Sequence, residues 1–273
     1  MAIITISREL AAFGEETARE LSSMTGYRVI DRDLIEKRLV EYGIKAEEQE
    51  KYDERKPGFW SSMSENWADY IQYLKLALYE EAAGGDCIVM GRGGSVVFKK
   101  VPNHLAVRIT APLGQRVERV MKQYSCDERQ ARHMVEQCDH NRIGFSKINF
   151  DINWADPREY DLTINTAKLD AGQAARIVKS YMALTIDADA EAAGKQALAD
   201  RLLGQKVLAE VIRSKKAHLV SLTVSVEKGV VTLGGLSNSE ATIDAVVTAA
   251  RSVPGIHEVK SAIHLVQEYT VIP

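Results

Sequence analysis

The residues best placed for chemistry in this chain are arginines that follow short apolar runs. Arg8 follows the apolar stretch 2–7 and precedes a loop and a helix expected over 15–24. Backbone N–H groups at such a helix start bind anions. Arg92 follows the apolar run 87–90 inside a glycine-rich turn, and its planar guanidinium suits bidentate contact with phosphate. An arginine between an apolar run and a loop or turn therefore predicts an anion site at both positions. For Arg92, the alternative is a surface arginine in a turn.

The loop after Arg8 has only part of the pattern that binds a triphosphate. Such a loop needs glycines that let N–H groups curve around phosphate, a lysine against the β- and γ-phosphates, and a hydroxyl for Mg²⁺. The window 9–17 keeps Gly14 and Thr17, whereas Glu15 stands at the lysine position. A charge reversal there is worth roughly 4 kcal/mol per unit pair at close range. Alternatively, Gly14 is a simple turn and Glu15 stabilises the helix start through the helix dipole.

Alternating strands and helices must position these arginines. Apolar runs predict five strands, at 2–7, 27–30, 87–90, 104–110 and 162–165. Helical patterns separate them, so we expect an α/β fold with a parallel, doubly wound sheet flanked by helices. Arg92 then lies at the carboxyl edge of the sheet, where such folds bind ligands.

The pattern changes in the last third of the chain. A helix at 196–214, strands at 219–226 and 230–233, a helix at 239–253 and a strand at 259–266 give a small α-β-β-α-β unit. We therefore expect an α/β domain over 1–183, a linker over 184–196 and a second domain over 197–273.

Composition limits the classes of protein. Of 273 residues, 35 are Lys or Arg and 38 are Asp or Glu, and the formal charge of −3 gives no reason to expect nucleic-acid binding. No apolar run reaches the roughly 18 residues of a membrane span. Three cysteines and no leader-like start predict a cytoplasmic location. His133, Cys138 and His140 lack a second ligand cluster, so no metal site is expected.

Five segments together resemble a known family. The segments are ITISREL, GYRVIDRDLIEK, IVMGRGGSVVF, APLGQRVERVM and YDLTINTAKL, in this order. They resemble the cytidylate-kinase-like branch of the P-loop nucleoside monophosphate kinases over about residues 1–183. The resemblance implies a P-loop kinase-like fold, ATP and Mg²⁺ as cofactors, and CMP or another nucleoside monophosphate as acceptor.

The same resemblance implies roles for particular residues. It places Arg8, Gly14 and Thr17 at the ATP phosphates, and Asp31, Arg32, Arg92 and Asn165 at the acceptor. It also implies that the transferring phosphate is held by Arg92, Arg116, Arg119 and Arg142.

Alternatives stay open for several of these residues. Asp31 is equally suited to cap a helix, and Asn165 to satisfy a loop. Arg116 and Arg119, interspersed with acidic residues, also fit an exposed helix with salt bridges.

The C-terminal unit resembles a BON domain over about 197–268, through VSVEKGVVTLGG and VPGIHEVKSAIHLV. The resemblance implies a small ligand or an anionic lipid as partner. A mildly basic stretch that includes Lys215, Lys216 and His218 is suited to an anionic lipid or nucleotide, with a solvated helix end as the alternative. Fusion to a kinase-like domain suggests regulation or homo-oligomerisation. Two functions therefore stand: a nucleotide-binding kinase, or a catalytically inactive ligand sensor or scaffold.

Overall fold

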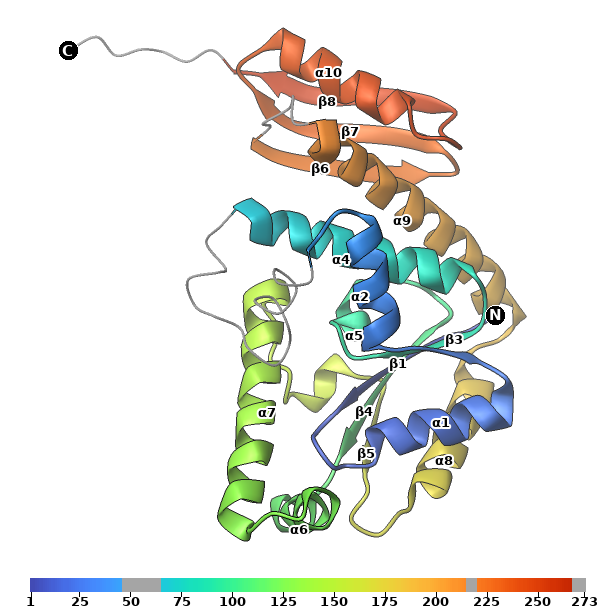
Figure 1. Cartoon of the computed structure of the whole chain (residues 1–273). Helices are drawn as coiled ribbons and strands as arrows, with labels where there is room; N and C mark the ends of the chain where they lie inside the picture. Colours follow the sequence, from blue (N-terminus) through green and yellow to red (C-terminus); the bar gives the residue numbers. More distant parts are fainter. Residues whose placement is uncertain (46–64, 215–219, 267–273) are drawn as a thin grey trace, which may run out of the picture. The chain divides into compact units, whose positions relative to one another are not determined.

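The computed structural model describes residues 1–45, 65–214 and 220–266 (Figure 1). Their elements, in chain order, are β1 (Ile3–Arg8), α1 (Gly14–Thr25), β2 (Arg28–Ile30), α2 (Arg32–Glu41), α4 (Glu65–Ala83), β3 (Cys87–Met90), α5 (Gly94–Val97), β4 (His104–Thr110), α6 (Leu113–Tyr124), α7 (Glu128–Phe150), the 3-10 helix η2 (Pro157–Glu159), β5 (Leu162–Asn165), α8 (Ala171–Thr185), α9 (Ala188–Ser214), β6 (Val220–Glu227), β7 (Val230–Ser237), α10 (Glu240–Arg251) and β8 (Glu258–Leu265).

The chain divides into two compact units. The first contains residues 1–71 and 84–195, and the second contains residues 72–83 and 196–273. The first unit holds a five-stranded sheet in the order β2-β3-β1-β4-β5, with every neighbouring pair parallel. The prediction of a parallel sheet flanked by helices is confirmed.

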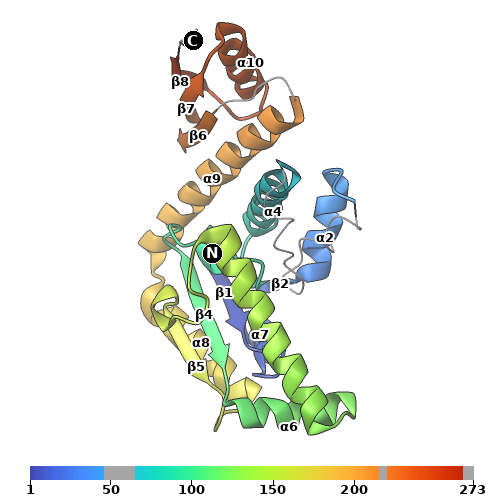
Figure 2. The same ribbon diagram turned by 90° about the vertical axis from the view of Figure 1, so that its left-hand side faces the viewer.

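Successive side chains of β1 point to opposite faces of the sheet, so they pack against different helices. Ile4 and Ile6 are fully buried in the core that α1 and α8 complete on one face. Thr5 points the other way, toward Gly94 at the start of α5. Strands buried on both faces are typical of parallel sheets covered by helices. Figures 1 and 2 show α7 and α8 on opposite sides of the strands.

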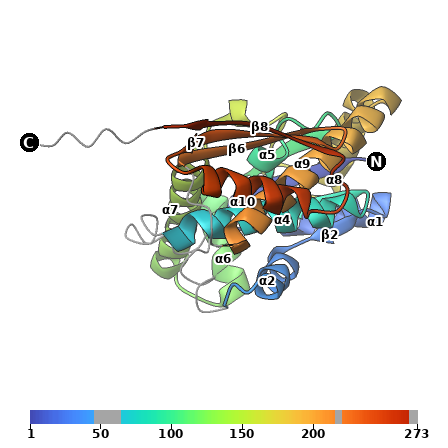
Figure 3. The same ribbon diagram turned by 90° about the horizontal axis from the view of Figure 1, so that it is seen from above.

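The second unit is built on a mixed three-stranded sheet. β7 pairs antiparallel with β6 and parallel with β8, which requires the crossover helix α10. Both α9 and α10 lie on the same side of this sheet (Figure 3). Val207 and Val211 of α9 and Val246 of α10 share its core with Val231 and Leu233 of β7. The predicted α-β-β-α-β order is confirmed.

Helices extend further than the sequence pattern indicated. The polar stretch after α6 is the long helix α7, which begins with a capping box formed by Asp127 and Gln130. α9 begins at Ala188, inside the stretch 184–196 expected as a linker. The Asp187 carboxylate accepts a hydrogen bond from the Ala190 N–H at 2.8 Å, and the following alanines favour helix. The basic stretch 215–218 lies outside the described residues.

A buried histidine at the start of β4 makes the stability of the first unit sensitive to pH. His104 Nε2 lies 2.8 Å from the Thr5 hydroxyl oxygen, and the imidazole contacts the Phe98 ring. Burial lowers the pKa of His104 from 6.5 to about 3, because the charged form loses hydration. Below pH 6.5 the His104 imidazole therefore binds a proton in the unfolded chain but not in the folded chain.

We expect the free energy of unfolding to fall with decreasing pH by on the order of 1 kcal/mol per pH unit through this histidine alone. The measurement is hydrogen exchange of the β1 amides between pH 6.5 and 5, compared between the wild type and His104→Gln. Glutamine retains a hydrogen-bonding group for Thr5 but does not titrate. Equal pH slopes in the two proteins would contradict the prediction.

Candidate functional site

The candidate site lies at the carboxyl edge of the five-stranded sheet. After β1 the chain turns toward β2 and β3, which lie on one side of β1, and later crosses to β4 on the other side. Ligands of open α/β sheets bind at such a switch point, beyond the carboxyl ends of the strands. The loops that follow β1, β3 and β5 meet the N-terminus of α1 here.

The loop after β1 follows a left-handed path without glycine at its turning points. Ala11 has φ 58° and Phe13 has φ 67°. A residue with a Cβ pays roughly 1–2 kcal/mol for this conformation. Phe13 is also the N-cap of α1, and its side chain makes no capping hydrogen bond.

Contacts from α6 and from the end of β5 hold this strained loop. Arg119 Nη1 donates to the Ala11 carbonyl at 3.0 Å, and its guanidinium stacks 3.7 Å from the centre of the Phe13 ring. The Thr166 hydroxyl donates to the Ala12 carbonyl at 2.9 Å. These bonds over-determine the backbone, which is how strained loops persist at functional sites. Arg119, expected at a transferring phosphate, is placed against the loop backbone.

Arg8 lies across the start of α1. A Cβ added to Gly14 would come within 2.4 Å of the Arg8 Cβ and Cγ atoms, so Gly14 is required for close approach. Arg8 Nε donates to Glu15 Oε1 at 2.9 Å. The side chain of Arg8 is 15% exposed and that of Glu15 is 53% exposed. The acid at the lysine position therefore pairs with the arginine at the end of β1.

Charges around Glu15 favour its ionised form. Burial acts to raise the pKa of Glu15, but the charge and hydrogen bond of Arg8, its own backbone, and the charge of Arg142 together hold this pKa below its ordinary value. The two arginines thus act on one carboxylate from two separate elements, β1 and α7.

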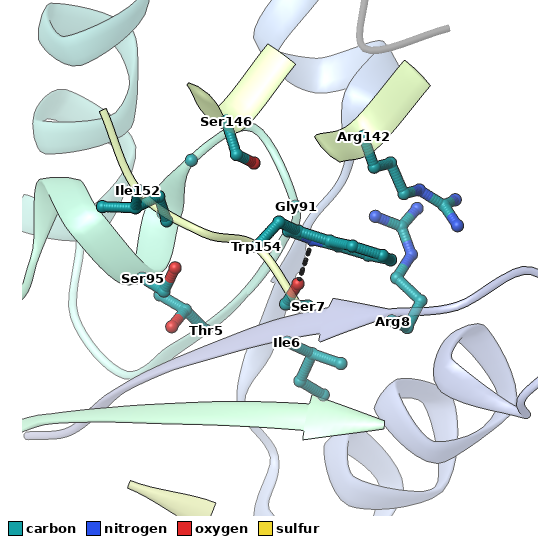
Figure 4. Close-up of a pocket in the computed structure, with 12 residues that line it drawn as sticks. Thr5, Ile6, Ser7, Arg8, Gly91, Ser95, Arg142, Ser146, Ile152 and Trp154 are labelled. Carbon is teal, nitrogen blue, oxygen red and sulfur yellow. Dashed lines mark hydrogen bonds between the residues drawn. The ribbon is translucent and has the colours of Figure 1, made fainter. Parts of the chain in front are cut away.

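Figure 4 shows the guanidinium groups of Arg8 and Arg142 facing each other at one end of a small hollow. The hollow measures about 20 Å³, room for about one water molecule. Its walls are made by β1, the glycine turn after β3, α7 and the segment around Trp154, and include the side chains of Thr5, Ser7, Ser95 and Ser146. Two cations and several hydroxyls converging on one hollow match the chemistry of an anion.

Trp154 closes this hollow. The indole N–H donates to the Ser7 hydroxyl at 2.8 Å, and the ring lies 4.0 Å from the Arg108 guanidinium carbon. Arg108 Nη1 donates to the Trp154 carbonyl at 2.6 Å, and Tyr160 donates to the same carbonyl at 2.9 Å. All of these side chains except Ser7 are far from β1 in sequence, yet they fix the roof over its carboxyl end.

Arg92 occupies a buried position in the glycine turn after β3. It has φ 54°, between Gly91 and Gly93, which also have positive φ. Its side chain is 4% exposed, and Nη2 lies 2.8 Å from Glu36 Oε1. Arg32 pairs with the same carboxylate oxygen. Glu36 of α2 therefore brings the guanidinium of Arg92, from the turn after β3, next to that of Arg32.

Arg116 joins a network of charges below the phosphate loop. Its Nη1 lies 2.8 Å from Asp139 Oδ2, and its Nε lies 3.4 Å from Glu9 Oε2. Glu9 also accepts from Arg108 at 3.2 Å and from the Ala111 N–H at 3.1 Å. The Arg116 side chain is 8% exposed. Its charge is committed to these carboxylates, which connect β1, β4, α6 and α7.

The remaining predicted residues make local contacts. Asp31 caps α2 by accepting from the Leu34 N–H at 3.0 Å. Asn165 accepts from the Ala167 N–H at 2.9 Å, and Thr17 donates to the Phe13 carbonyl at 2.6 Å. For Asp31 and Asn165 these are the contacts that the structural alternatives predicted.

A wider groove adjoins Arg8 on the side of β2. It measures about 420 Å³, and its lining includes Arg8, Glu15, Asp31, Arg32 and Met90. The structure thus brings Arg8 and Arg142 together at the hollow, with Gly14 packed against the Arg8 side chain, and Asp31 and Arg32 to the neighbouring groove. Arg92 and Arg116 lie in buried ion pairs.

The sequence analysis did not single out Glu9, Glu36, Trp154 or Thr166. Glu9 carried a signal, because an acidic residue directly after Arg8 in a phosphate loop needs a cationic partner. Thr166 lies next to the predicted Asn165 at the same strand end. Glu36 and Trp154 had no local signal, since their partners are distant in sequence.

The parallel sheet, the loop after β1 and the arginines around it define a P-loop kinase-like α/β fold. The sequence model of the Cytidylate kinase-like family matches residues 3–168, more than half of the chain, so the chain belongs to this family. The BON domain model matches residues 199–267. Both predicted resemblances are confirmed.

Two solved structures are similar to part of this chain. An uncharacterized protein from Eubacterium ventriosum is 20% identical, with a TM-score of 0.54, over 67% of this chain and 99% of that chain. Shikimate kinase from Acinetobacter baumannii is 14% identical, with a TM-score of 0.39, over 68% of this chain and 96% of that chain. These likenesses concern the fold alone.

One curated relative matches over a short stretch. Uronate isomerase from Corynebacterium glutamicum is 32% identical over 101 residues, which is 36% of this chain. The match spans only 19% of the isomerase. So small a share says nothing of an isomerase activity here.

The described residues contain neither a cluster of metal-binding side chains nor a membrane-spanning helix. Within residues 1–45, 65–214 and 220–266, no three His, Cys, Asp or Glu side chains cluster as metal ligands would. Across the same part of the chain, every helix is too short or too polar to span a bilayer.

Proposed function

We propose that the first unit binds a nucleotide through its phosphate group, and that binding, rather than rapid phosphoryl transfer from ATP, is its main property. The observation that carries this proposal is the pair Arg8 and Arg142, whose guanidinium groups face each other at the carboxyl edge of β1 (Figure 4). Guanidinium pairs bind phosphate oxygens through charge-assisted hydrogen bonds. CMP is the expected ligand, because the chain belongs to the Cytidylate kinase-like family.

The residues at the loop do not fit Mg²⁺ and ATP. Glu15 places a negative charge where a triphosphate needs a cation, and Arg8 is paired with that charge. The Thr17 side chain is fully buried and donates its hydroxyl to the Phe13 carbonyl. We therefore derive no transfer step through ATP.

A second candidate is a catalytically inactive sensor or scaffold, with the BON unit as the regulatory or ligand-binding part. The observation that favours it is the pairing of the expected transfer arginines with carboxylates. Arg92 pairs with Glu36, and Arg116 with Asp139. Phosphoryl transfer needs such cations on the transferring group, so their internal pairing reduces what they contribute to it.

The test is a thermal-shift and coupled ADP-release screen of the full chain with ATP, GTP, CMP, dCMP and UMP in the presence of Mg²⁺. We expect CMP at about 100 times its Kd to add roughly 2.7 kcal/mol of stability, with a Tm rise of several degrees. ADP release is expected to stay far below the 1–100 s⁻¹ that is typical of kinases.

Arg142→Ala should abolish the thermal shift. Arg132→Ala is its matched control, because Arg132 lies on the same helix and pairs with Glu128, one turn away. ADP release at an ordinary kinase rate would contradict the proposal and identify the chain as an ATP:CMP phosphotransferase. If no nucleotide raises the Tm, the proposal of nucleotide binding is wrong and the scaffold function is the candidate that remains.

A further inference from the structure

The Glu15 carboxylate stands between a ligand-sized groove and the arginine pair. Arg8 lines both the small hollow and the groove of about 420 Å³, whereas Glu15 lines the groove alone. Arg8 Nε donates a hydrogen bond to Glu15 Oε1, and the two atoms are 2.9 Å apart. A phosphate that enters from the groove therefore meets Arg8 where Glu15 already binds it.

We propose that Glu15 is a built-in competitor for the ligand's phosphate group, which holds Arg8 until a phosphomonoester displaces it. This inference rests on the proposed function, since it describes how the same site is regulated. It also names the ligand class as phosphomonoesters.

The chemistry of the two anions makes the exchange possible. A carboxylate and a phosphate both accept two parallel hydrogen bonds from a guanidinium. A phosphomonoester carries about −1.5 to −2 charges at pH 7, against −1 for a carboxylate, so it binds two arginines more strongly. A neutral nucleoside brings no such charge and leaves Glu15 in place.

Exposure of the two partners decides which of them moves. Glu15 is 53% exposed, so its carboxylate can rotate into solvent without being buried unpaired. Arg8 is 15% exposed, and its stem packs against Gly14. Arg8 stays and Glu15 leaves. Other charges on the groove wall are Arg19, Asp31, Arg32 and Asp33.

Titration calorimetry of the full chain with CMP, inorganic phosphate and cytidine tests the competition, using Glu15→Gln. Removing the charge while keeping the shape should tighten CMP and phosphate about tenfold and leave cytidine unchanged. Glu16→Gln is the matched control, because Glu16 lies in the same helical turn and its carboxylate is 3.9 Å from Arg19. It should change CMP affinity less than twofold.

Equal CMP affinity in the wild type and Glu15→Gln would overturn the inference and leave the proposed function intact. Failure of both proteins to bind CMP and phosphate would instead overturn the proposed function, and the competition with it. A second readout is the Glu15 carboxyl pKa, followed by NMR on ¹³C-labelled protein. This pKa should rise toward its ordinary value when CMP saturates the site. A pKa that stays low with CMP bound would refute displacement.

Discussion

Glu15→Lys is expected to raise the affinity of the chain for Mg²⁺-ATP by about 100-fold. A unit charge pair at about 4 Å is worth roughly 4 kcal/mol at an effective dielectric near 20. Residue 15 is half exposed, so solvent screens a large part of this energy. A net gain of about 2.7 kcal/mol remains, which corresponds to two orders of magnitude in Kd.

The measurement is calorimetric titration with ATP and Mg²⁺, beside Glu16→Lys as the control. Glu16 also lies in the first turn of α1, so its variant has the same change of net charge. A similar gain in both variants would mean that general charge, and not position 15, governs ATP binding. No gain in either would mean that the left-handed backbone at Ala11 and Phe13, with its side chains, already excludes the triphosphate.

A stability loss should accompany the gain in ATP affinity. The lysine removes the Arg8–Glu15 ion pair and places a third cation beside Arg8 and Arg142. The loss should be modest, about 1 kcal/mol, because the pair is partly exposed. ADP release by Glu15→Lys tells whether a lysine at position 15 is enough to give the chain phosphotransferase activity.

Trp154→Ala is expected to lower the free energy of unfolding of the first unit by about 3–5 kcal/mol. Trp154 is 6% exposed, and its removal leaves a cavity beside β1. The Arg108 guanidinium, 4.0 Å from the ring centre, loses its stacking partner inside the protein. Hydrogen exchange of the β1 amides measures the opening of this unit directly.

Trp154→Phe separates packing from hydrogen bonding. Phenylalanine keeps a ring over Arg108 but loses the N–H that donates to Ser7 at 2.8 Å. The Tyr160 hydroxyl oxygen stays 3.2 Å from the Ser7 hydroxyl and can accept a hydrogen bond from it, so the loss should be near 1 kcal/mol. A loss below 1 kcal/mol for Trp154→Ala would contradict the role of this side chain as the roof of the hollow.

The architecture could be predicted because its signals are local. Apolar runs such as 87–90 determine buried strands, and Asp170 and Gln173 form a capping box at the start of α8. The order of strands and helices then leaves few topologies for a parallel sheet. The length of α7 and the early start of α9 were missed because polar and alanine-rich segments carry a weak apolar period.

The candidate site could be predicted only in part. Arg8, Gly14 and Arg142 were singled out; the fold brings Arg8 and Arg142 to one hollow and packs Gly14 against Arg8. The left-handed backbone at Ala11 and Phe13 was not foreseeable, because their intrinsic preference opposes it. Arg119 and Thr166 compensate for that preference from α6 and from the end of β5.

The α/β type of the fold and the acidic residue Glu15 in the loop after β1 could be read from the chain alone. These depend on neighbouring residues, and neighbouring residues are read directly from the chain. Only the tertiary structure decided which arginines meet a carboxylate. Arg92 pairs with Glu36 from α2, and Arg116 with Asp139 from α7. Electrostatic energy depends on distance in space and on burial, and the folding of distant segments against one another sets both.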